Sequence, residues 1–110
     1  MDKYSHAIEK LTNALECLAT HPGDVRKRVA SAYLLCAHLS LEELPEKCRE
    51  DWKWIVKEIT KRGAFTLMDG RVWRGAAENT MQQVRKSTGA KIAKRFYKLY
   101  WEVSKNEPYA

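Results

Sequence analysis

The sequence of 110 residues has no apolar run that approaches the ~20 residues of a membrane-spanning helix. Its first residues, MDKYSHAIEKL, lack the basic and then apolar layout of a signal peptide. Cysteine is sparse and odd in number, at positions 17, 36 and 48, which favours reduced thiols over a disulfide framework. These absences together predict a cytoplasmic protein that does not enter a membrane.

The sequence also lacks a glycine-rich phosphate loop and the G-x-S-x-G and H-E-x-x-H motifs. The metal candidates are Cys17, His21, Cys36 and His38. On a helical hairpin, Cys36 lies roughly 18 Å along the second helix from Asp24, at ~1.5 Å per residue, whereas zinc holds its ligands within ~2.0–2.3 Å. Cys17 has no evident histidine partner that would activate it as a nucleophile. We therefore expect no enzyme activity, no metal and no cofactor.

Apolar residues recur at helical spacing through most of the chain, and the few glycines and prolines mark the breaks. The pattern predicts an all-α fold, a compact bundle of about five helices in a single domain over residues 1–110, with a frayed tail at about 105–110. The second helix is apolar around most of its circumference, which is typical of a central helix. The predicted helices span about 2–20, 25–40, 45–62, 76–86 and 88–104.

Polar residues at the predicted helix starts indicate caps. Asp24 is a good N-cap for the second helix. Ser40 and Glu43 have the spacing of a capping box. Ser87 or Thr88 is the expected cap of the fifth helix.

Residues 64–75, AFTLMDGRVWRG, do not follow the helical pattern. Asp69-Gly70 between two short apolar runs is a hairpin signal, although an isolated two-stranded ribbon is only marginally stable. The segment is expected to form either a small β-hairpin near 65–73 that packs on the helices, or an irregular ordered loop.

Two tryptophans stand two positions apart in the third helix, so they point to opposite sides. Trp52 shares the apolar side and is predicted to be core, whereas Trp54 aligns with the charged side. Either Trp54 is covered by residues 64–75, where it would meet Phe65 or Trp73, or it is an exposed binding anchor. The candidate partner-binding residues are Trp54, Lys57, Lys61 and Trp73.

Positive charge is concentrated in the second half of the chain. Residues 1–52 carry 7 Lys/Arg and 9 Asp/Glu, and residues 53–110 carry 13 and 5, so the balances are −2 and +8 and their sum is the net +6. Such an asymmetry is compatible with an acidic partner surface or a polyanion, and also with lysines that only solvate exposed helix faces.

The fifth helix carries a basic row beside aromatic residues, opposite an apolar face, in the run TGAKIAKRFYKLYWEVSK. A basic row edged by flat rings suits a phosphate backbone with stacking alongside it, although aromatic residues at helical spacing also serve as core. A helix-turn-helix is a sharper alternative, with its turn at 86–89 and with Thr88, Lys91 and Arg95 facing DNA. The candidate nucleic-acid-binding residues are Lys91, Lys94, Arg95, Lys98, Tyr97 and Trp101.

Two long runs resemble small, uncharacterised all-helical bacterial and prophage proteins. The first, GDVRKRVASAYLLCAHLSLEELPEKCREDWKWIVKEITK, shares a Gly-Asp-Val-Arg helix start, a Leu-Pro turn and an aromatic-centred helix with them. The second, ENTMQQVRKSTGAKIAKRFYKLY, is similar to their C-terminal part. The resemblance covers most of the chain and implies a bacterial or prophage setting and a helical fold. It implies no activity and transfers no functional residue.

The sequence therefore favours a non-enzymatic cytosolic interaction module that binds a protein partner, for instance a phage- or mobile-element-related accessory protein. The alternative is a nucleic-acid-binding protein that uses the basic C-terminal helix. The identity of the partner and the oligomeric state stay open at this point.

Overall fold

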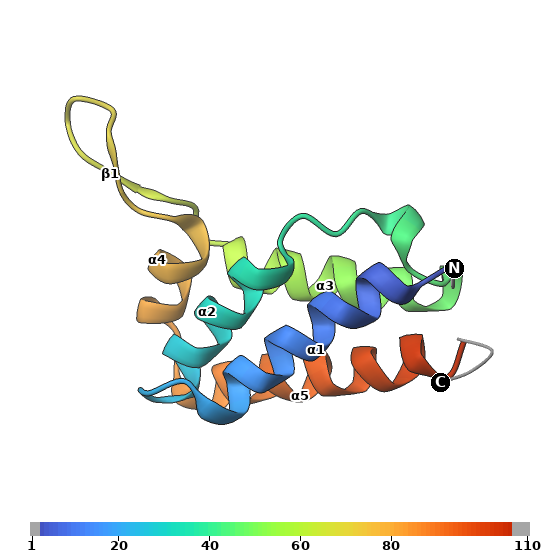
Figure 1. Cartoon of the computed structure of the whole chain (residues 1–110). Helices are drawn as coiled ribbons and strands as arrows, with labels where there is room; N and C mark the ends of the chain where they lie inside the picture. The colour runs from blue at the N-terminus through green and yellow to red at the C-terminus, as the bar shows by residue number, and fades with distance from the viewer. Residues whose placement is uncertain (1–2, 107–110) are drawn as a thin grey trace.

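The computed structural model describes residues 3–106, which form a bundle of five α-helices with one small two-stranded sheet (Figure 1). The predicted all-α fold and the predicted hairpin are thus confirmed. The predicted frayed tail lies outside the described residues from position 107 onward. The elements are α1 (Ser5–Thr20), α2 (Val25–Cys36), the 3₁₀ turns η1 (Leu41–Glu43) and η2 (Glu46–Cys48), α3 (Arg49–Thr60), β1 (Phe65–Thr66), β2 (Val72–Arg74), α4 (Ala76–Gln83) and α5 (Lys86–Ser104).

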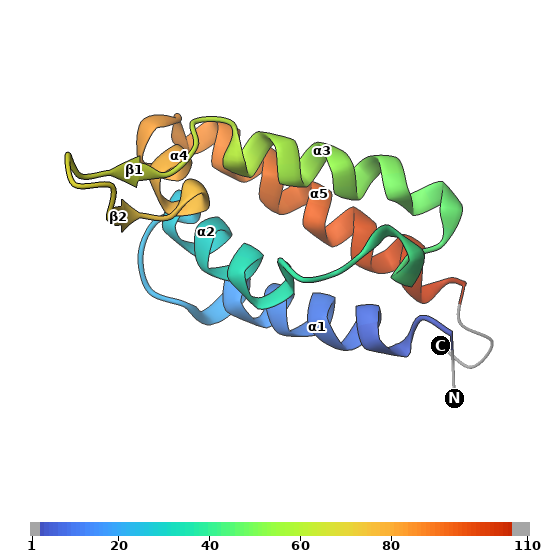
Figure 2. The ribbon, with the colours of Figure 1, turned by 90° about the horizontal axis from the view of Figure 1, so that it is seen from above.

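The last helix, α5, lies along the middle of the bundle, where it packs against α1, α2 and α3 (Figure 2). Trp52 is 3% exposed, as predicted, and its ring centroid lies 6.2 Å from that of Phe96 on α5. The indole Nε1 donates to the carbonyl oxygen of Leu39 at 3.3 Å, so the buried ring has its polar atom satisfied. The fully buried apolar side chains of α5 are Ile92, Phe96, Leu99 and Val103.

The second helix packs against three others, as expected of a central helix, but it is not buried on every side. Although α2 packs against α1, α4 and α5, its Leu34 and Leu35 side chains remain exposed. The helix also ends at Cys36, four residues earlier than expected. The chain leaves the helix there because Leu39 and Leu44 turn inward and are buried in the core.

The two caps predicted for the first half of the chain are present. Asp24 Oδ1 accepts a hydrogen bond from the Arg26 backbone N–H at 2.8 Å, which caps α2. The Glu43 carboxylate accepts from the Ser40 backbone N–H at 2.8 Å, although this box opens only the short turn η1.

The predicted start of the fifth helix is wrong. Neither Ser87 nor Thr88 is the cap, because α5 begins at Lys86 with Arg85 as its N-cap residue. Gly89 packs so closely against α2 that a Cβ atom would lie 3.1–3.3 Å from side-chain and backbone atoms of residues 25 and 26. This contact fixes the first turn of the helix in a place that no local signal indicates.

The hairpin β1–β2 stands away from the bundle, as Figure 1 shows. Its strands pair antiparallel with a bulge. The Leu67 backbone N–H donates to Arg71 O at 2.8 Å, and Gly70 has φ of +88°, which is the conformation that a three-residue hairpin loop requires at its last position. The predicted Asp69-Gly70 turn is therefore confirmed, but the hairpin does not pack on the helices as that prediction supposed.

Two buried polar side chains of α4 hold the base of the hairpin. Thr80 Oγ1 accepts from the Arg62 backbone N–H at 3.0 Å, and Asn79 Nδ2 donates to Gly63 O at 3.0 Å. Because their backbone partners, Arg62 and Gly63, lie between the end of α3 and the start of β1, these two bonds fix the direction in which the hairpin leaves the bundle.

Phe96→Ala is expected to destabilise the fold by about 3–5 kcal/mol, because it opens a cavity at the centre of the core. The neighbouring substitution Tyr97→Ala is the matched control, since Tyr97 points about 100° away from Phe96 and is exposed. Its effect should stay within about 0.5 kcal/mol. Urea unfolding followed by tryptophan fluorescence measures both, and equal losses for the two variants would contradict the central place of α5.

Candidate functional site

The Trp54 indole is covered by a cation from α5. The guanidinium of Arg95 lies over the ring, 4.3 Å from its centroid. Arg95 Nη1 donates to Asp51 Oδ1 at 3.0 Å, and Lys98 Nζ lies 3.5 Å from Asp51 Oδ2. Because the Asp51 carboxylate is only 16% exposed and Arg95 only 34%, this pair is partly desolvated, whereas Lys98 stays 59% exposed.

This arrangement corrects both sequence-based expectations for Trp54. The tryptophan does not lie under residues 64–75, since that segment stands away from the bundle (Figure 2). It is not a free anchor either, because it is partly buried against the core and the guanidinium occupies its outer face. The cause is the packing of α3 against α5, which brings together residues more than forty positions apart.

The four predicted partner-binding residues do not form one surface. Trp54 and the exposed Lys57 of α3 line a shallow depression of 400 Å³, which Arg95 of α5 also lines. Lys61 caps the end of that helix and pairs with Glu58 at 3.3 Å. Trp73 belongs to the separate hairpin, where its side chain is 66% exposed.

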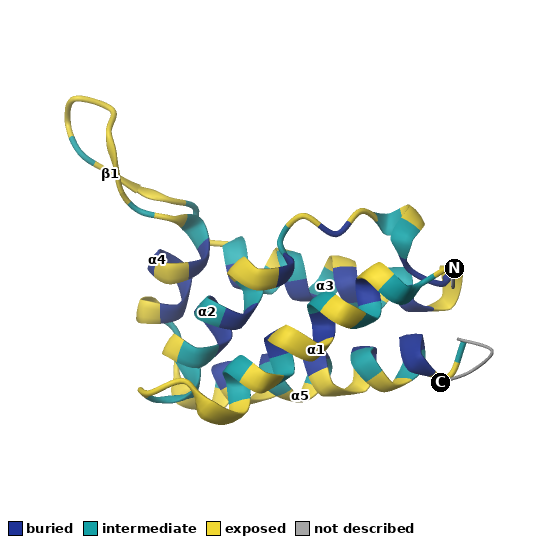
Figure 3. Cartoon of the chain, viewed as in Figure 1, coloured by how far each residue is buried: buried dark blue, intermediate teal, exposed yellow. Residues whose placement is uncertain are grey.

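Most of the hairpin is exposed (Figure 3), and several of its exposed side chains are large and apolar. Met68 is fully exposed at the loop, and Phe65, Val72 and Trp73 are exposed on the strands. A strand with one buried face alternates apolar and polar residues, and this segment does not. The absence of that alternation is the sequence signal that could have revealed the exposure of the hairpin.

The basic helix divides its cations between two roles. Lys91, Lys94 and Lys98 are exposed along α5, whereas Arg95 turns toward α3 and is engaged there. Beside the lysines, Tyr97 and Trp101 are 55% and 48% exposed. Their ring centroids lie 6.2 Å apart, with the planes inclined at 76°. Of the six predicted nucleic-acid contacts, the structure therefore leaves five on the open side of the helix.

The helix-turn-helix prediction is wrong. The residues expected to form its turn, 86–89, lie within the first turn of α5, and the actual link is Val84-Arg85. Of this segment, Gly89 is buried against α2, and Arg95 is held by Asp51. Furthermore, α4 packs chiefly on α2 and α3, so α4 and α5 do not make the compact pair that the motif requires.

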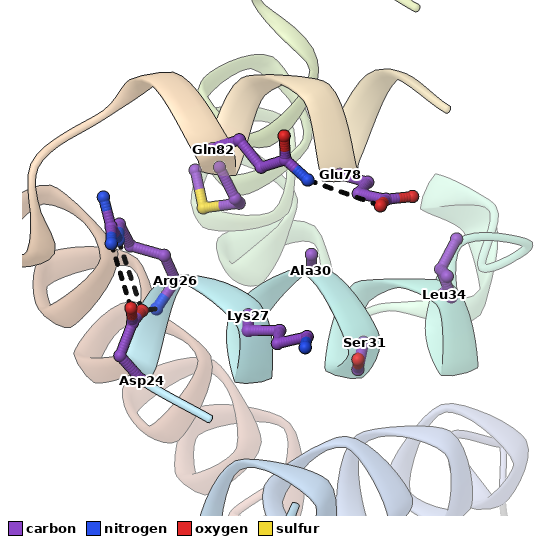
Figure 4. A pocket seen from close by; sticks show the side chains of 9 residues that line it. Asp24, Arg26, Lys27, Ala30, Ser31, Leu34, Glu78 and Gln82 are labelled. Carbon is purple, nitrogen blue, oxygen red and sulfur yellow. Dashed lines mark hydrogen bonds and ion pairs between the residues drawn. The ribbon is translucent and has the colours of Figure 1, made fainter. Parts of the chain in front are cut away.

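A groove of 570 Å³ between α2 and α4 was not predicted from the sequence (Figure 4). Ala30, Leu34 and Met81 supply its apolar lining, and charged side chains stand at its rim. At one end, the hydrogen-bonded Arg26 side chain holds the pKa of the Asp24 carboxyl well below its ordinary value.

The candidate catalytic and metal-binding thiols are in unreactive surroundings. Burial raises the pKa of the Cys36 thiol to about 12, and burial also raises the pKa of Cys17. Both thiols are therefore protonated at neutral pH and are poor nucleophiles and poor metal ligands. Within residues 3–106, no three His, Cys, Asp or Glu side chains are grouped so that they could hold a metal ion.

Comparison of the chain with family models, curated proteins and solved structures finds no match in any of the three. In the part of the chain that the structure describes, no helix combines the length and the apolar character needed to cross a bilayer.

Asp51→Asn is expected to destabilise the protein by about 1–2 kcal/mol, since Arg95 keeps its charge but loses its carboxylate. The control is Glu50→Gln, which removes the same charge from the next residue, an exposed partner of Lys53 at 3.3 Å, and should cost less than about 0.5 kcal/mol. Urea unfolding measures both. If the two variants are equally stable, the Asp51 contacts do not hold α3 to α5.

Proposed function

We propose that the chain is a non-enzymatic protein-binding module that docks on its partner through the hairpin β1–β2, with Trp73 as the main anchor. The observation that carries the proposal is the exposure of four large apolar side chains on a segment that stands away from the bundle. Apolar side chains that gather on a protruding element are typical of an interaction site. The group consists of Phe65, Met68, Val72 and Trp73.

The hairpin is preorganised for docking, which lowers the ordering entropy that binding must overcome. The Arg71 side chain donates to Asp69 Oδ2 at 2.6 Å across the loop. At the other end, the Arg74 guanidinium lies 4.9 Å from the centroid of the Phe65 ring and its Nη1 donates to the Gln82 side chain of α4. These contacts, together with the two hydrogen bonds at the base, support a hairpin that holds its shape without a partner.

The charge of the segment indicates the chemistry of the partner. Residues 64–75 contain two Arg and one Asp, a balance of +1, and the basic residues Lys61 and Arg62 precede them. A complementary surface would have an apolar pocket for the indole of Trp73 with carboxylates at its edge. This proposal moves the anchor from Trp54, which was the first candidate, to Trp73.

The remaining parts of the proposal have separate support. The non-enzymatic role is supported by the lack of a recognised catalytic motif in the sequence, and a cytoplasmic setting by free cysteines at 17, 36 and 48. The assignment to a bacterial or prophage accessory protein rests on the resemblance of the two long runs alone.

Photo-crosslinking in the cells that express the chain tests the hairpin. A photoreactive amino acid at position 68 should give a discrete protein adduct, because that position lies at the tip of the hairpin. The same amino acid at position 13, an exposed site on α1, should not give it.

Trp73→Ala should weaken the adduct-forming complex about thirtyfold, as the loss of a binding hot spot does, while thermal unfolding stays unchanged since the side chain is exposed. The same adducts from positions 68 and 13, or an adduct indifferent to Trp73→Ala, would refute docking through the hairpin.

A further inference from the structure

We propose that the outward side of α5 binds single-stranded nucleic acid, with Tyr97 and Trp101 as stacking platforms and the adjacent lysines as phosphate contacts. This surface lies on a different element from the hairpin, and the inference does not rest on the proposed protein-binding function. It begins with the rings themselves. The indole of Trp101 contacts both Tyr97, with centroids 6.2 Å apart, and Tyr100, with centroids 5.6 Å apart, so the exposed rings brace one another.

The exposure of these rings needs an explanation. In α5 the apolar stripe that includes Phe96 and Leu99 is fully buried, so Tyr97 and Trp101 are not required for the core. Both instead keep about half of their surface in water. Bases stack on exposed aromatic rings without regard to sequence, because each base has a π-face. Two rings one helical turn apart, about 6 Å along the axis, offer sites to two bases that are not stacked on each other.

Lysines stand beside each ring at helical spacing. Lys94 precedes Tyr97 by three residues and Lys98 precedes Trp101 by three, and side chains at this spacing are neighbours on a helix. Lys91 extends the row toward the start of the helix. Within residues 3–106, Lys91 and Lys94 form no ion pair. Their charges are thus available to phosphate groups.

Acidic groups near this surface do not cancel its charge. Asp51 accepts from Arg95 and lies 3.5 Å from Lys98 Nζ, yet the Lys98 side chain remains 59% exposed. Glu102 pairs with Lys105 at 3.5 Å. Lys91, Lys94 and Lys98 therefore give the rings a positive border along the helix.

The surroundings of α5 favour an unpaired strand over a duplex. A recognition helix must enter the major groove, but α5 is flanked by α1 and α3, and its Gly89 end is buried against α2. Only its outer side is open. In a duplex the bases are already stacked on one another, so none is available to stack on Tyr97 or Trp101. An unpaired strand offers both its bases and its phosphates.

The test uses fluorescence anisotropy of labelled dT15 and U15 oligonucleotides, which separate DNA from RNA. With about three phosphate contacts, the log–log salt slope should be about −2, so affinity should fall about fifteen- to twentyfold between 50 and 200 mM salt. Binding of either oligonucleotide with this slope supports the site. No binding at 50 mM salt, or equally effective competition by a duplex or by polyglutamate, would overturn it.

Variants separate stacking from charge. Tyr97→Ala and Trp101→Ala should each weaken binding about fivefold or more without loss of the fold. Lys94→Gln/Lys98→Gln should also reduce the steepness of the salt slope by more than one unit. The matched control, Lys27→Gln/Arg62→Gln, removes the same charge elsewhere on the surface and should leave affinity unchanged. Equal losses with the control pair, or no effect of either aromatic substitution, would refute the proposed surface.

Finally, Trp73→Ala should leave oligonucleotide binding unchanged, because Trp73 lies on the hairpin rather than on α5. This keeps the two proposals apart: the hairpin can fail its own test while α5 binds the oligonucleotides, and the reverse also holds. A loss of oligonucleotide affinity in Trp73→Ala would show that the strand is not bound by α5 alone, and would overturn the surface as defined here.

Discussion

Burial of the apolar side of α5 is the constraint on which the bundle depends. Its side chains at positions 92, 96, 99 and 103 have no exposed surface, and α1, α2 and α3 all pack around them. Since an α-helix turns once in 3.6 residues, burying this stripe forces the other side of the same helix outward. The open positions of Tyr97, Trp101 and the lysines are therefore consequences of the core. Any function that uses this surface is coupled to the fold at the level of one helix.

The residues at the border between these two sides decide how the helices are joined. Arg95 lies too far from the buried stripe to be core and too near to α3 to be free, and it meets both the Trp54 ring and the Asp51 carboxylate. A guanidinium suits this position because it can stack on a ring and donate in its own plane at the same time. The charge that the sequence presents as one basic row is thus divided by tertiary packing into a structural cation and a set of open lysines.

Local pattern was sufficient for some of this architecture and not for the rest. Helical periodicity correctly predicted that Trp52 is buried in the core, and the Asp69-Gly70 turn correctly predicted the hairpin. Both predictions use only residues that are close together in the sequence. The cover over Trp54 and the start of α5 depend instead on partners from α5 and α2, respectively. For the same reason, the sequence revealed the existence of the hairpin but not its direction, which is set by hydrogen bonds from α4 to residues 62 and 63. The groove between α2 and α4 needed the packing of two helices and was invisible in either one.

The two proposed surfaces lie on different elements of an elongated molecule whose longest extent is 50 Å (Figure 1). The hairpin projects from the end where α4 lies, whereas Tyr97 and Trp101 belong to the C-terminal half of α5. Screening at physiological salt reduces direct charge effects beyond about 8 Å, so a ligand on the hairpin and one on the two rings would interact little with each other through their charges. The balance of +8 in residues 53–110 nevertheless gives both surfaces the same sign. An acidic protein and a nucleic-acid strand would therefore be attracted to the same half of the sequence. The shape of each surface distinguishes them: the protruding apolar hairpin fits a pocket on a protein, and the aromatic rings of α5 fit unpaired bases. The base of the hairpin is tied to α4 and not to α5, so the two proposed surfaces are held by different contacts.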